Sequence, residues 1–355
     1  MFALILFKSY NKAEVIMKIL VDAFGGDNAP GEIVKGAVLA INEKKDLTVV
    51  LVGKKQDIEN ELSKYQFNKE QVEIINADDV VLNEDHPVSA IRNKPNSSLV
   101  VAFNNLKENE QFDALVSAGN SGAVLAGAQI KLGKIKGVQR PTLMTTFPNI
   151  LGGTVLLADA GVNMDCKAEY LAQFALMANL YATKIQKKEN PTVGLLNVGV
   201  EEFKGDERSK QAYNLLKKLP INFVGNMESR DYISGKWDII VSDGFAGNVL
   251  NKGTEGAVLN FLKMFKRYIK ESFGAKIGYL LMKKQLKKML KVVDFNEHGG
   301  ALFMGVNKVV IKCHGASRAN SIRLAIFEAY DAASSGIIEL LKKEAEGFSE
   351  IKIDD

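Results

Sequence analysis

The chain has 355 residues, of which 25% are charged, and its formal net charge at pH 7 is +4. This length allows one large domain or two ordinary ones, and the composition is that of a globular protein, not of a disordered or fibrous one. The two cysteines, Cys166 and Cys313, exclude a disulfide framework and fit a reducing cytosol.

The N-terminal apolar run FALILF is too short to span a membrane, and it lacks the basic flank and the cleavage site of a secretory signal. The uncharged stretch 141–158 is interrupted by Pro148 and by two glycines, which argues against a membrane span. The regular strand and helix pattern begins only at Met17. We therefore expect residues 1–16 to be a dispensable extension.

Short apolar runs recur along the chain, and most of them end in a turn rich in Gly, Asn, Asp or Ser. The sequence predicts strands at 17–22, 47–53, 72–77, 113–117, 154–160, 193–198, 237–241 and 309–312. At least six of these turns open a helix, whereas 80–98 is predicted to be a long loop. Strands that alternate with helices predict a doubly wound, mainly parallel α/β sheet with all these turns along one edge.

Such turns offer backbone N–H groups and helix N-termini, which favour anions. Several of them along one edge predict a phosphate or oxyanion site. The chain contains no G-x-G-x-x-G, no P-loop motif and no G-x-S-x-G, which argues against dinucleotide binding, P-loop chemistry and serine hydrolysis. Its three histidines lack the spacing of metal ligands.

The stretch 191–210, PTVGLLNVGVEEFKGDERSK, organises this interpretation. A buried strand ends at Gly199, and a helix begins near Glu207. Between them, Glu201 and Lys204 are placed in the crevice at the carboxyl end of the strand, where open α/β sheets bind ligands. An ordinary solvated loop is the alternative.

The segment 254–293 differs from the rest of the chain. Between Gly256 and Val293, ten lysines and arginines accompany a single acid, Glu271, so the rest of the chain carries a net charge of −5. Apolar residues at helical spacing, and an apolar cluster at 277–282, predict a basic helical pair with an apolar tip. Two interpretations stay open: a stripe packed on the core or on a second subunit, and a surface that meets anionic lipid or an acidic protein.

Read together, the motifs resemble the bacterial phosphate acyltransferase family, the acyl-ACP:phosphate transacylases of phospholipid synthesis. The resemblance extends from Met17 to about Leu341. Departures are confined to turns and include Asn28 for histidine, Ser121 for threonine and Leu302 for proline. The matching stretches are ILVDAFGGDNAPGEIVKG, RNKPNSSL, LVSAGNSGAVLAG, RPTL, GLLNVGVEEFKG, FVGNMESRD, VSDGFAGNVLNKGTEG, GGALFMGVN and HGAS.

The resemblance implies a phosphotransacetylase- and isocitrate dehydrogenase-like α/β fold, with 17–346 as a single domain and 347–355 as a polar tail. It also implies a cytoplasmic homodimer in which inorganic phosphate attacks the thioester of a long-chain acyl-ACP, with acyl carrier protein as the acyl donor. No cofactor, metal or nucleic acid is implied. The basic pair suits peripheral membrane contact, with the acyl phosphate passing to a glycerol-3-phosphate acyltransferase.

The same resemblance implies roles for particular residues. Lys204 is the cation that offsets phosphate charge, and Asn248 is a neutral donor to the oxyanion or the phosphate. The roles of His298 and His314 stay open. Further candidates for phosphate or substrate binding are Asp22, Gly25, Gly26, Asn120, Ser121, Gly122, Glu201, Asn226 and Asp243. Candidates for contact with membrane or ACP are Lys276, Ile277, Leu280, Leu281, Lys283 and Lys284.

Two other functions compete with this one. A short-chain phosphotransacetylase using acyl-CoA would share the fold. A non-catalytic membrane scaffold would use only the basic helical pair. Because acyl carrier protein is acidic, the basic segment favours the acyl-ACP enzyme.

Overall fold

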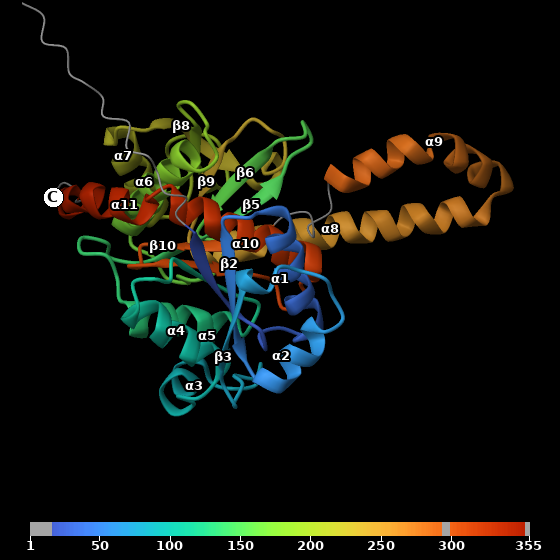
Figure 1. The fold of residues 1–355 in the computed structure, drawn as a ribbon. Coiled ribbons are helices and arrows are strands. Elements are labelled where there is room, and N and C mark those ends of the chain that lie inside the picture. The colour runs from blue at the N-terminus through green and yellow to red at the C-terminus, as the bar shows by residue number, and fades with distance from the viewer. Residues whose placement is uncertain (1–15, 293–298, 352–355) are drawn as a thin grey trace, which may run out of the picture.

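A computed structural model describes residues 16–292 and 299–351, and the structural statements below refer to these residues. Eleven strands form one sheet in the order β3-β2-β1-β4-β11-β10-β5-β6-β9-β7-β8. Helices cover the sheet, and a helical hairpin projects from this body (Figure 1). The extension expected at residues 1–16 lies outside the described residues, apart from Ile16.

The two halves of the sheet run in opposite directions. The first half, β1 (Met17–Asp22), β2 (Leu47–Gly53), β3 (Val72–Asn76), β4 (Ala114–Ser117) and β11 (Val309–Lys312), is parallel throughout. The second half, β6 (Thr154–Ala158), β7 (Thr192–Asn197), β8 (Asn222–Glu228) and β9 (Ile239–Val241), is parallel within itself. Between the halves, β10 (Ala301–Met304) and β5 (Thr142–Pro148) pair antiparallel with each other and with both neighbours.

This reversal corrects the expectation that all turns share one edge. The carboxyl ends of β1, β4 and β11 lie at one edge of the sheet, and those of β6, β7 and β9 lie at the opposite edge. The strands β5, β8 and β10 were not predicted. Three antiparallel pairs, β11–β10, β10–β5 and β5–β6, lie between the halves. Because this number is odd, the strands from β6 to β8 in the sheet order run opposite to those of the first half. The mainly parallel α/β class itself is confirmed.

Helices pack on the faces of the sheet through alternating strand residues. Ile19 and Val21 of β1 face the layer of α1 (Gly31–Glu43), α2 (Lys55–Leu62) and α10 (Ala319–Ser334), together with α6 (Ala168–Lys184), α7 (Glu207–Lys218) and α11 (Ile337–Glu344). Leu20 faces the opposite layer, built from α4 (Ser98–Glu108), α5 (Ser121–Gly127) and the π-helical continuation η2 (Ala128–Leu132). Successive strand residues alternate in side, so each face receives its own apolar set.

The segment expected as a long loop at 80–98 contains the short helix α3 (Pro87–Asn93), with Pro87 at the first helical position. Proline suits this position because its missing N–H would have no partner there. At the other end of the chain, the 3₁₀ helix η5 (Ala345–Glu350) buries Phe348, which is 2% exposed. The tail expected to be polar from 347 therefore begins with a segment that packs on the body. Short 3₁₀ turns also occur at η1 (Lys69–Gln71) and η3 (Ser229–Asp231).

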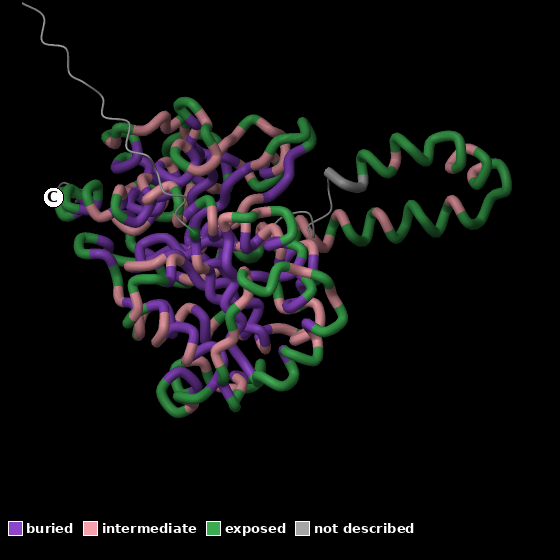
Figure 2. The backbone as a smooth tube through the Cα atoms, viewed as in Figure 1, coloured by how far each residue is buried: buried purple, intermediate pink, exposed green. Residues whose placement is uncertain are grey.

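The basic segment forms two long helices, α8 (Gly244–Glu271) and α9 (Phe273–Val292), which meet at the extended residue Ser272. The pair thus starts at Gly244 and not at 254, and the apolar cluster 277–282 lies within α9 and not at the turn. Of the residues in α8, only Gly244 and Gly247 are buried. Figure 2 shows the hairpin as almost wholly exposed or intermediate, so its apolar stripe is not packed on the core of its own chain. No helix in the described ranges has the length and apolar character that crossing a membrane requires.

Candidate functional site

The candidate residues fall into two clusters, one at each edge of the sheet. Lys204, Glu201, Asp243 and Asn248 follow strands of the second half, and Asn226 lies within β8. Asp22, Gly25, Gly26 and the segment 120–122 follow strands of the first half. Leu125 of α5 and Val162 of the turn after β6 both pack against the core cluster on one face of the sheet.

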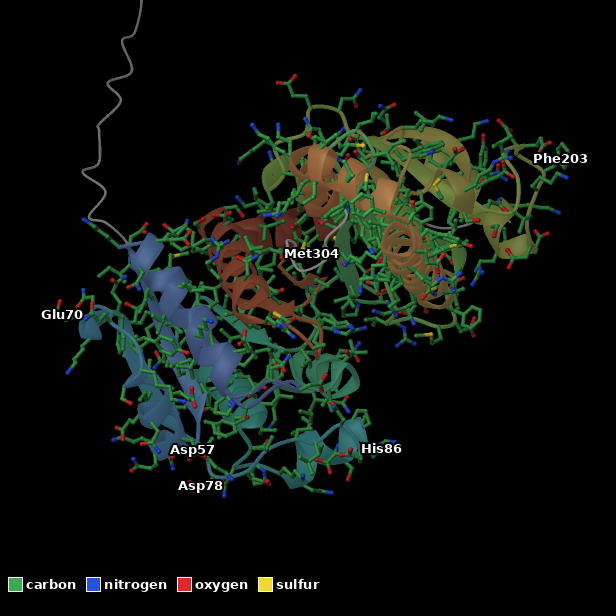
Figure 3. All side chains as sticks on the ribbon, turned by 90° about the vertical axis from the view of Figure 1, so that its right-hand side faces the viewer. Asp57, Glu70, Asp78, His86, Phe203 and Met304 are labelled. Carbon is green, nitrogen blue, oxygen red and sulfur yellow. The ribbon has the colours of Figure 1, made fainter. Side chains whose placement is uncertain are left out.

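Lys204 lies in the exposed loop between β7 and α7. Its backbone N–H donates to the carbonyl of Glu201 at 3.1 Å, and its carbonyl accepts from Asn197 Nδ2 at 3.1 Å. The ammonium lies 5.6 Å from the centre of the Phe203 ring, and no carboxylate in the described part of the chain pairs with it. Figure 3 shows Phe203 at the outer margin of the molecule. The loop therefore presents an unneutralised cation to solvent.

Asn226 of β8 holds the backbone of this loop by a hydrogen bond. Its Nδ2 donates to the carbonyl of Glu201 at 2.8 Å, while its buried Oδ1 has no described partner. Asn226 is 3% exposed. It therefore acts on the loop backbone, and the side chain of Glu201 remains exposed.

Asp243 caps α8, because its Oδ1 accepts from the Ala246 N–H at 2.7 Å. Its Oδ2 forms an ion pair with Arg208 Nη2 at 2.7 Å, and the same guanidinium lies 3.3 Å from Asp206. Sequence reasoning missed Arg208. Arg208 is the second residue of α7. Its place in the sequence does not indicate that its partner, Asp243, lies in the turn after β9. Arg208 joins the Lys204 loop to the start of α8.

Asn248 lies in the second turn of α8 and is exposed. A Cβ atom on Gly161 would lie 3.4 Å from the Cβ, Cγ and Oδ1 atoms of Asn248. Gly161 has a φ of 139°, which L side chains rarely adopt. Glycine at position 161 therefore lets the backbone of the turn after β6 pass close to the side chain of Asn248.

The first-half cluster is organised around Asp22. Ser98 Oγ donates to its Oδ1 at 2.6 Å and Ser117 Oγ donates to its Oδ2 at 2.7 Å. Burial raises the pKa of Asp22, and these hydrogen bonds oppose the shift. A Cβ on Gly25 would lie 2.6 Å from Asp22 Oδ2, so this glycine is required for packing. Both carboxylate oxygens are thus already occupied by protein donors.

The segment 120–122 also has structural partners. Asn120 caps α5 by accepting from the Ala123 N–H at 3.0 Å, and its Nδ2 donates to the carbonyl of Asn83 at 3.0 Å. A Cβ on Gly122 would lie 2.6 Å from Pro87, which explains the glycine. Ser121 is exposed, and Gly26, with a φ of 98°, lets the chain pass close to Gly315. Only Ser121 in this segment has its side chain directed to solvent.

The proposed membrane or ACP contacts all lie on α9. Lys276, Lys283 and Lys284 are exposed, and the apolar side chains beside them are exposed as well: Ile277 by 46%, Leu280 by 65% and Leu281 by 81%. Large aliphatic side chains exposed on this scale, flanked by cations, mark an interaction surface.

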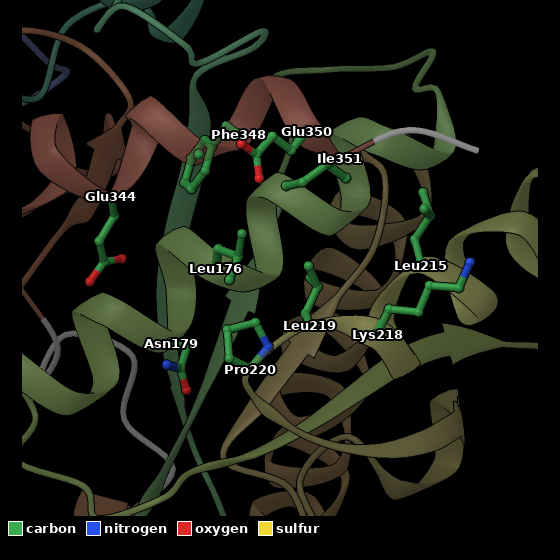
Figure 4. A pocket seen from close by; sticks show the side chains of 11 residues that line it. Leu176, Asn179, Leu215, Lys218, Leu219, Pro220, Glu344, Phe348, Glu350 and Ile351 are labelled. Atoms are coloured by element: carbon green, nitrogen blue, oxygen red, sulfur yellow. The ribbon is translucent and has the colours of Figure 1, made fainter. Parts of the chain in front are cut away.

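A cavity of about 600 Å³ lies elsewhere, between α6, the end of α7 and η5 (Figure 4). Its walls include Leu176, Leu219 and Phe348, with Lys218 and Glu344 among its polar lining. None of the candidate residues lines it. This cavity is therefore separate from the candidate residues.

Comparison with known proteins identifies the family. A family model described as "Fatty acid synthesis protein" matches residues 17–340. The phosphate acyltransferase of Clostridioides difficile (strain 630) is 45% identical over 323 residues, which cover 91% of this chain and 94% of the relative. The phosphate acyltransferase of Caldicellulosiruptor saccharolyticus is 45% identical over 336 residues, which cover 94% of this chain and 100% of the relative. The chain belongs to the phosphate acyltransferase family.

Solved structures support the fold of this phosphate acyltransferase. EutD phosphotransacetylase from Staphylococcus aureus matches with a TM-score of 0.57 at 15% identity, covering 90% of this chain and 94% of that one. A branched-chain phosphotransacylase from Enterococcus faecalis V583 matches with a TM-score of 0.56 at 14% identity, covering 89% and 99%. At these identities the likeness concerns the fold alone, and it confirms the predicted phosphotransacetylase-like architecture.

Proposed function

We propose that this enzyme transfers the acyl group of a long-chain acyl-ACP to inorganic phosphate, giving acyl phosphate and free ACP for phospholipid synthesis. The observation that carries the proposal is the unneutralised ammonium of Lys204, on a loop tied by Arg208 to the helix that bears Asn248. A cation and a neutral amide donor on neighbouring turns suit a reaction between an anion and a carbonyl group.

The chemistry needs no protein nucleophile. An oxygen of the hydrogen phosphate dianion attacks the thioester carbonyl carbon, and negative charge develops on the carbonyl oxygen. The C–S bond then breaks, its electron pair goes to sulfur, and the phosphate proton ends on the thiol of the carrier. Lys204 holds the phosphate and offsets its charge, while Asn248 donates to the oxyanion or the phosphate.

Apolar side chains around Lys204 support a long acyl chain as substrate. Val198 is 80% exposed, Val200 57% and Phe203 70%, all in the same loop. On α8, Phe245 is 64% and Val249 57% exposed, on the same part of the helix as Asn248. Burial of apolar surface contributes roughly 25 cal/mol per Å², so a long acyl chain would gain far more here than an acetyl group.

The positive charge of the hairpin formed by α8 and α9 supports the proposal that the acidic carrier protein and an anionic membrane surface are its partners. Its cations lie on an arm that projects from the body (Figure 1). We also propose a homodimer, supported by Ile150 and Leu151 at the β5–β6 turn, which are 69% and 74% exposed. A glycerol-3-phosphate acyltransferase is the proposed consumer of the acyl phosphate.

The proposal is tested by trapping acyl phosphate with hydroxylamine. Purified enzyme is given palmitoyl-ACP with and without phosphate, and acetyl-CoA with phosphate. We expect phosphate-dependent hydroxamate from palmitoyl-ACP and little from acetyl-CoA. The reverse preference would assign the short-chain phosphotransacetylase reaction. Absence of product with both donors would favour the scaffold.

A further inference from the structure

A second cationic surface lies on the segment 131–140, which leads from η2 to β5. Residues 114–158 contain no Asp or Glu, and their four cations all lie in this segment: Lys131, Lys134, Lys136 and Arg140. The last three of these are exposed. In the part of the chain that the structure describes, no carboxylate forms an ion pair with any of the four. The segment therefore presents positive charge that its own chain does not pair.

The backbone beneath these cations is fixed to the rest of the body. Asn307, in the turn between β10 and β11, donates from Nδ2 to the carbonyls of Leu132 and Lys134 at 3.0 and 3.2 Å. Ile135 and Val138 are only 2% and 4% exposed. The segment thus buries its apolar side chains and turns its charges outward. A surface held in this way has little conformational freedom to lose when a partner binds.

The 131–140 segment ends beside the candidate residues of the second half. Pro141, the next residue, accepts at its carbonyl from Asn163 Nδ2 at 2.8 Å. Asn163 in turn accepts at its own carbonyl from the N–H of Gly244, the first residue of α8, at 2.7 Å. The same turn after β6 contains Gly161, which lies close to Asn248. Direct hydrogen bonds therefore connect the end of the segment to the turn and to the helix that bear the site.

The hairpin lies on a different side of the body. A Cβ atom on Gly137 would lie 2.0 Å from the carbonyl oxygen of Ala345, so the 131–140 segment packs against the start of η5. Figure 1 shows α11 and the C-terminus, which flank η5, on the side of the body away from the projecting hairpin. A membrane that contacts α9 would therefore leave the 131–140 segment accessible to another partner.

The two surfaces also differ in chemistry. Helix α9 exposes Leu280 and Leu281 beside its lysines, whereas all three aliphatic side chains of the 131–140 segment are buried. Ile130, which precedes the segment, is 43% exposed. Binding at a lipid interface depends on buried apolar area as well as on charge, so the segment is poorly suited to it. Clustered cations without apolar side chains suit a protein whose surface is acidic.

We propose that the 131–140 segment is the docking surface for the acidic acyl carrier protein, with Lys134, Lys136 and Arg140 facing its carboxylates. This inference rests on the proposed acyl-ACP substrate, and it assigns the carrier to this surface rather than to the hairpin. The carrier then stands at the sheet edge where β6 and β9 end, and the hairpin stays free for lipid. Complementary charge speeds the encounter and sets the orientation of the carrier.

Charge reversal on the segment tests the assignment. We expect Lys134→Glu/Lys136→Glu to raise the KM for palmitoyl-ACP by about tenfold or more, and to raise the Kd for labelled holo-ACP, measured by fluorescence anisotropy, by a similar factor. Turnover at saturating palmitoyl-ACP should fall far less than kcat/KM, because docking precedes the chemistry. The difference from the wild type should shrink at high salt, which screens exposed charges.

Two further variants control for folding and for net charge. Lys134 Nζ also donates to the carbonyl of Gln139 at 2.8 Å, so melting temperatures are compared. The neutral variant Lys134→Gln/Lys136→Gln should shift KM and Kd in the same direction by a smaller factor. Lys54→Glu/Lys69→Glu makes the same change in net charge at exposed lysines between β2 and β3, and it is the matched control.

Other outcomes overturn the inference. An unchanged Kd in folded Lys134→Glu/Lys136→Glu would remove the segment from carrier binding. If Lys283→Glu/Lys284→Glu on α9 raises the Kd and the segment variant does not, the carrier docks on the hairpin. Weaker flotation of the segment variant on anionic vesicles, with an unchanged Kd for the carrier, would assign the surface to lipid.

Failure of the proposed function gives a different result. A wild type that makes no acyl phosphate from palmitoyl-ACP would contradict the proposed reaction. Anisotropy needs no turnover, so the Kd values of the wild type and of the variants still decide whether the 131–140 segment binds the carrier. A wild type that does not bind holo-ACP would overturn the docking surface itself.

Discussion

Arg208 Nη2 lies 2.7 Å from Asp243 Oδ2, and this ion pair joins two turns that are far apart in the sequence. Asp243 also caps α8, and Arg208 also contacts Asp206 at the start of α7. One guanidinium therefore sets the position of the Lys204 loop relative to the helix that bears Asn248. Because Asp243 is only 7% exposed, loss of the cation would leave its carboxylate buried without a charged partner.

We predict that Arg208→Leu lowers kcat by about tenfold and the free energy of unfolding by roughly 1–3 kcal/mol, the cost of an uncompensated buried polar group. Arg208→Lys should recover part of the stability and less of the activity, because both contacts of Arg208 come from Nη2 of a rigid planar guanidinium, whereas an ammonium sits on a more flexible stem. Urea unfolding and the hydroxamate assay measure the two effects. Arg230→Leu is the control, since Arg230 is a 77% exposed surface residue paired with Glu228. Equal effects in both variants would remove any special role from Arg208.

Lys204→Ala should reduce turnover by about 10²-fold, the usual loss for one preorganised electrostatic contact, with little change in melting temperature because the side chain is exposed. The KM for phosphate should rise if the ammonium holds phosphate in the ground state as well. Lys210→Ala on the exposed face of α7 serves as the control. Near-normal turnover in folded Lys204→Ala would remove Lys204 from the site.

Glu328 should make stability depend on pH. Its carboxylate accepts from Tyr181 Oη and from the Gly300 N–H, both at 3.0 Å. Although part of the residue reaches solvent, burial of the carboxylate raises its pKa from 4.5 to about 7. Between these values the unfolded chain releases the proton that the folded chain keeps. We therefore expect the contribution of Glu328 to stability to be fully present below pH 4.5, to fall as the pH rises to about 7, and then to level off.

The expected loss from Glu328 is about 1–3 kcal/mol, since one pKa unit corresponds to about 1.4 kcal/mol and the residue is not wholly enclosed. In Glu328→Gln this contribution should vanish, so the difference from the wild type should grow between pH 5 and pH 8. Urea unfolding at four pH values measures it, with exposed Glu346→Gln as the control. Parallel curves for the wild type and Glu328→Gln would contradict the assignment.

The hairpin should bind anionic vesicles reversibly. Each cation near the surface contributes about 1 kcal/mol, and screening by salt should weaken binding. We expect Leu280→Glu/Leu281→Glu to reduce flotation, because both leucines are exposed on α9. Leu82→Glu/Val88→Glu, at apolar residues 53% and 39% exposed on another part of the surface, is the matched control. If the wild type ignores anionic vesicles at low salt, the hairpin serves the carrier or a second subunit instead.

Local patterns predicted the individual elements well and their directions poorly. The runs at 47–53 and 309–312 form strands within those bounds, because buried β-branched runs bounded by turn residues leave little alternative. The reversal at β10 and β5 depends on pairing between residues 142–145 and 301–304, which no local pattern encodes. The candidate site has the same two parts, local motifs and long-range contacts. Lys204 and Asn248 follow from family motifs, whereas Arg208 acquires its role only from a contact across two turns.

The uninterrupted course of α8 has a mechanical consequence. At 1.5 Å per residue, about 35 Å separates Asn248 from Glu271 at the far end of the helix. A stiff helix of this length would act as a lever, with Asn248, the proposed donor, near the end that joins the body. A surface that tilts the hairpin would thus rotate the Asn248 amide against the fixed turn after β6, so that attachment and turnover become linked by rigidity rather than by a relay of side chains.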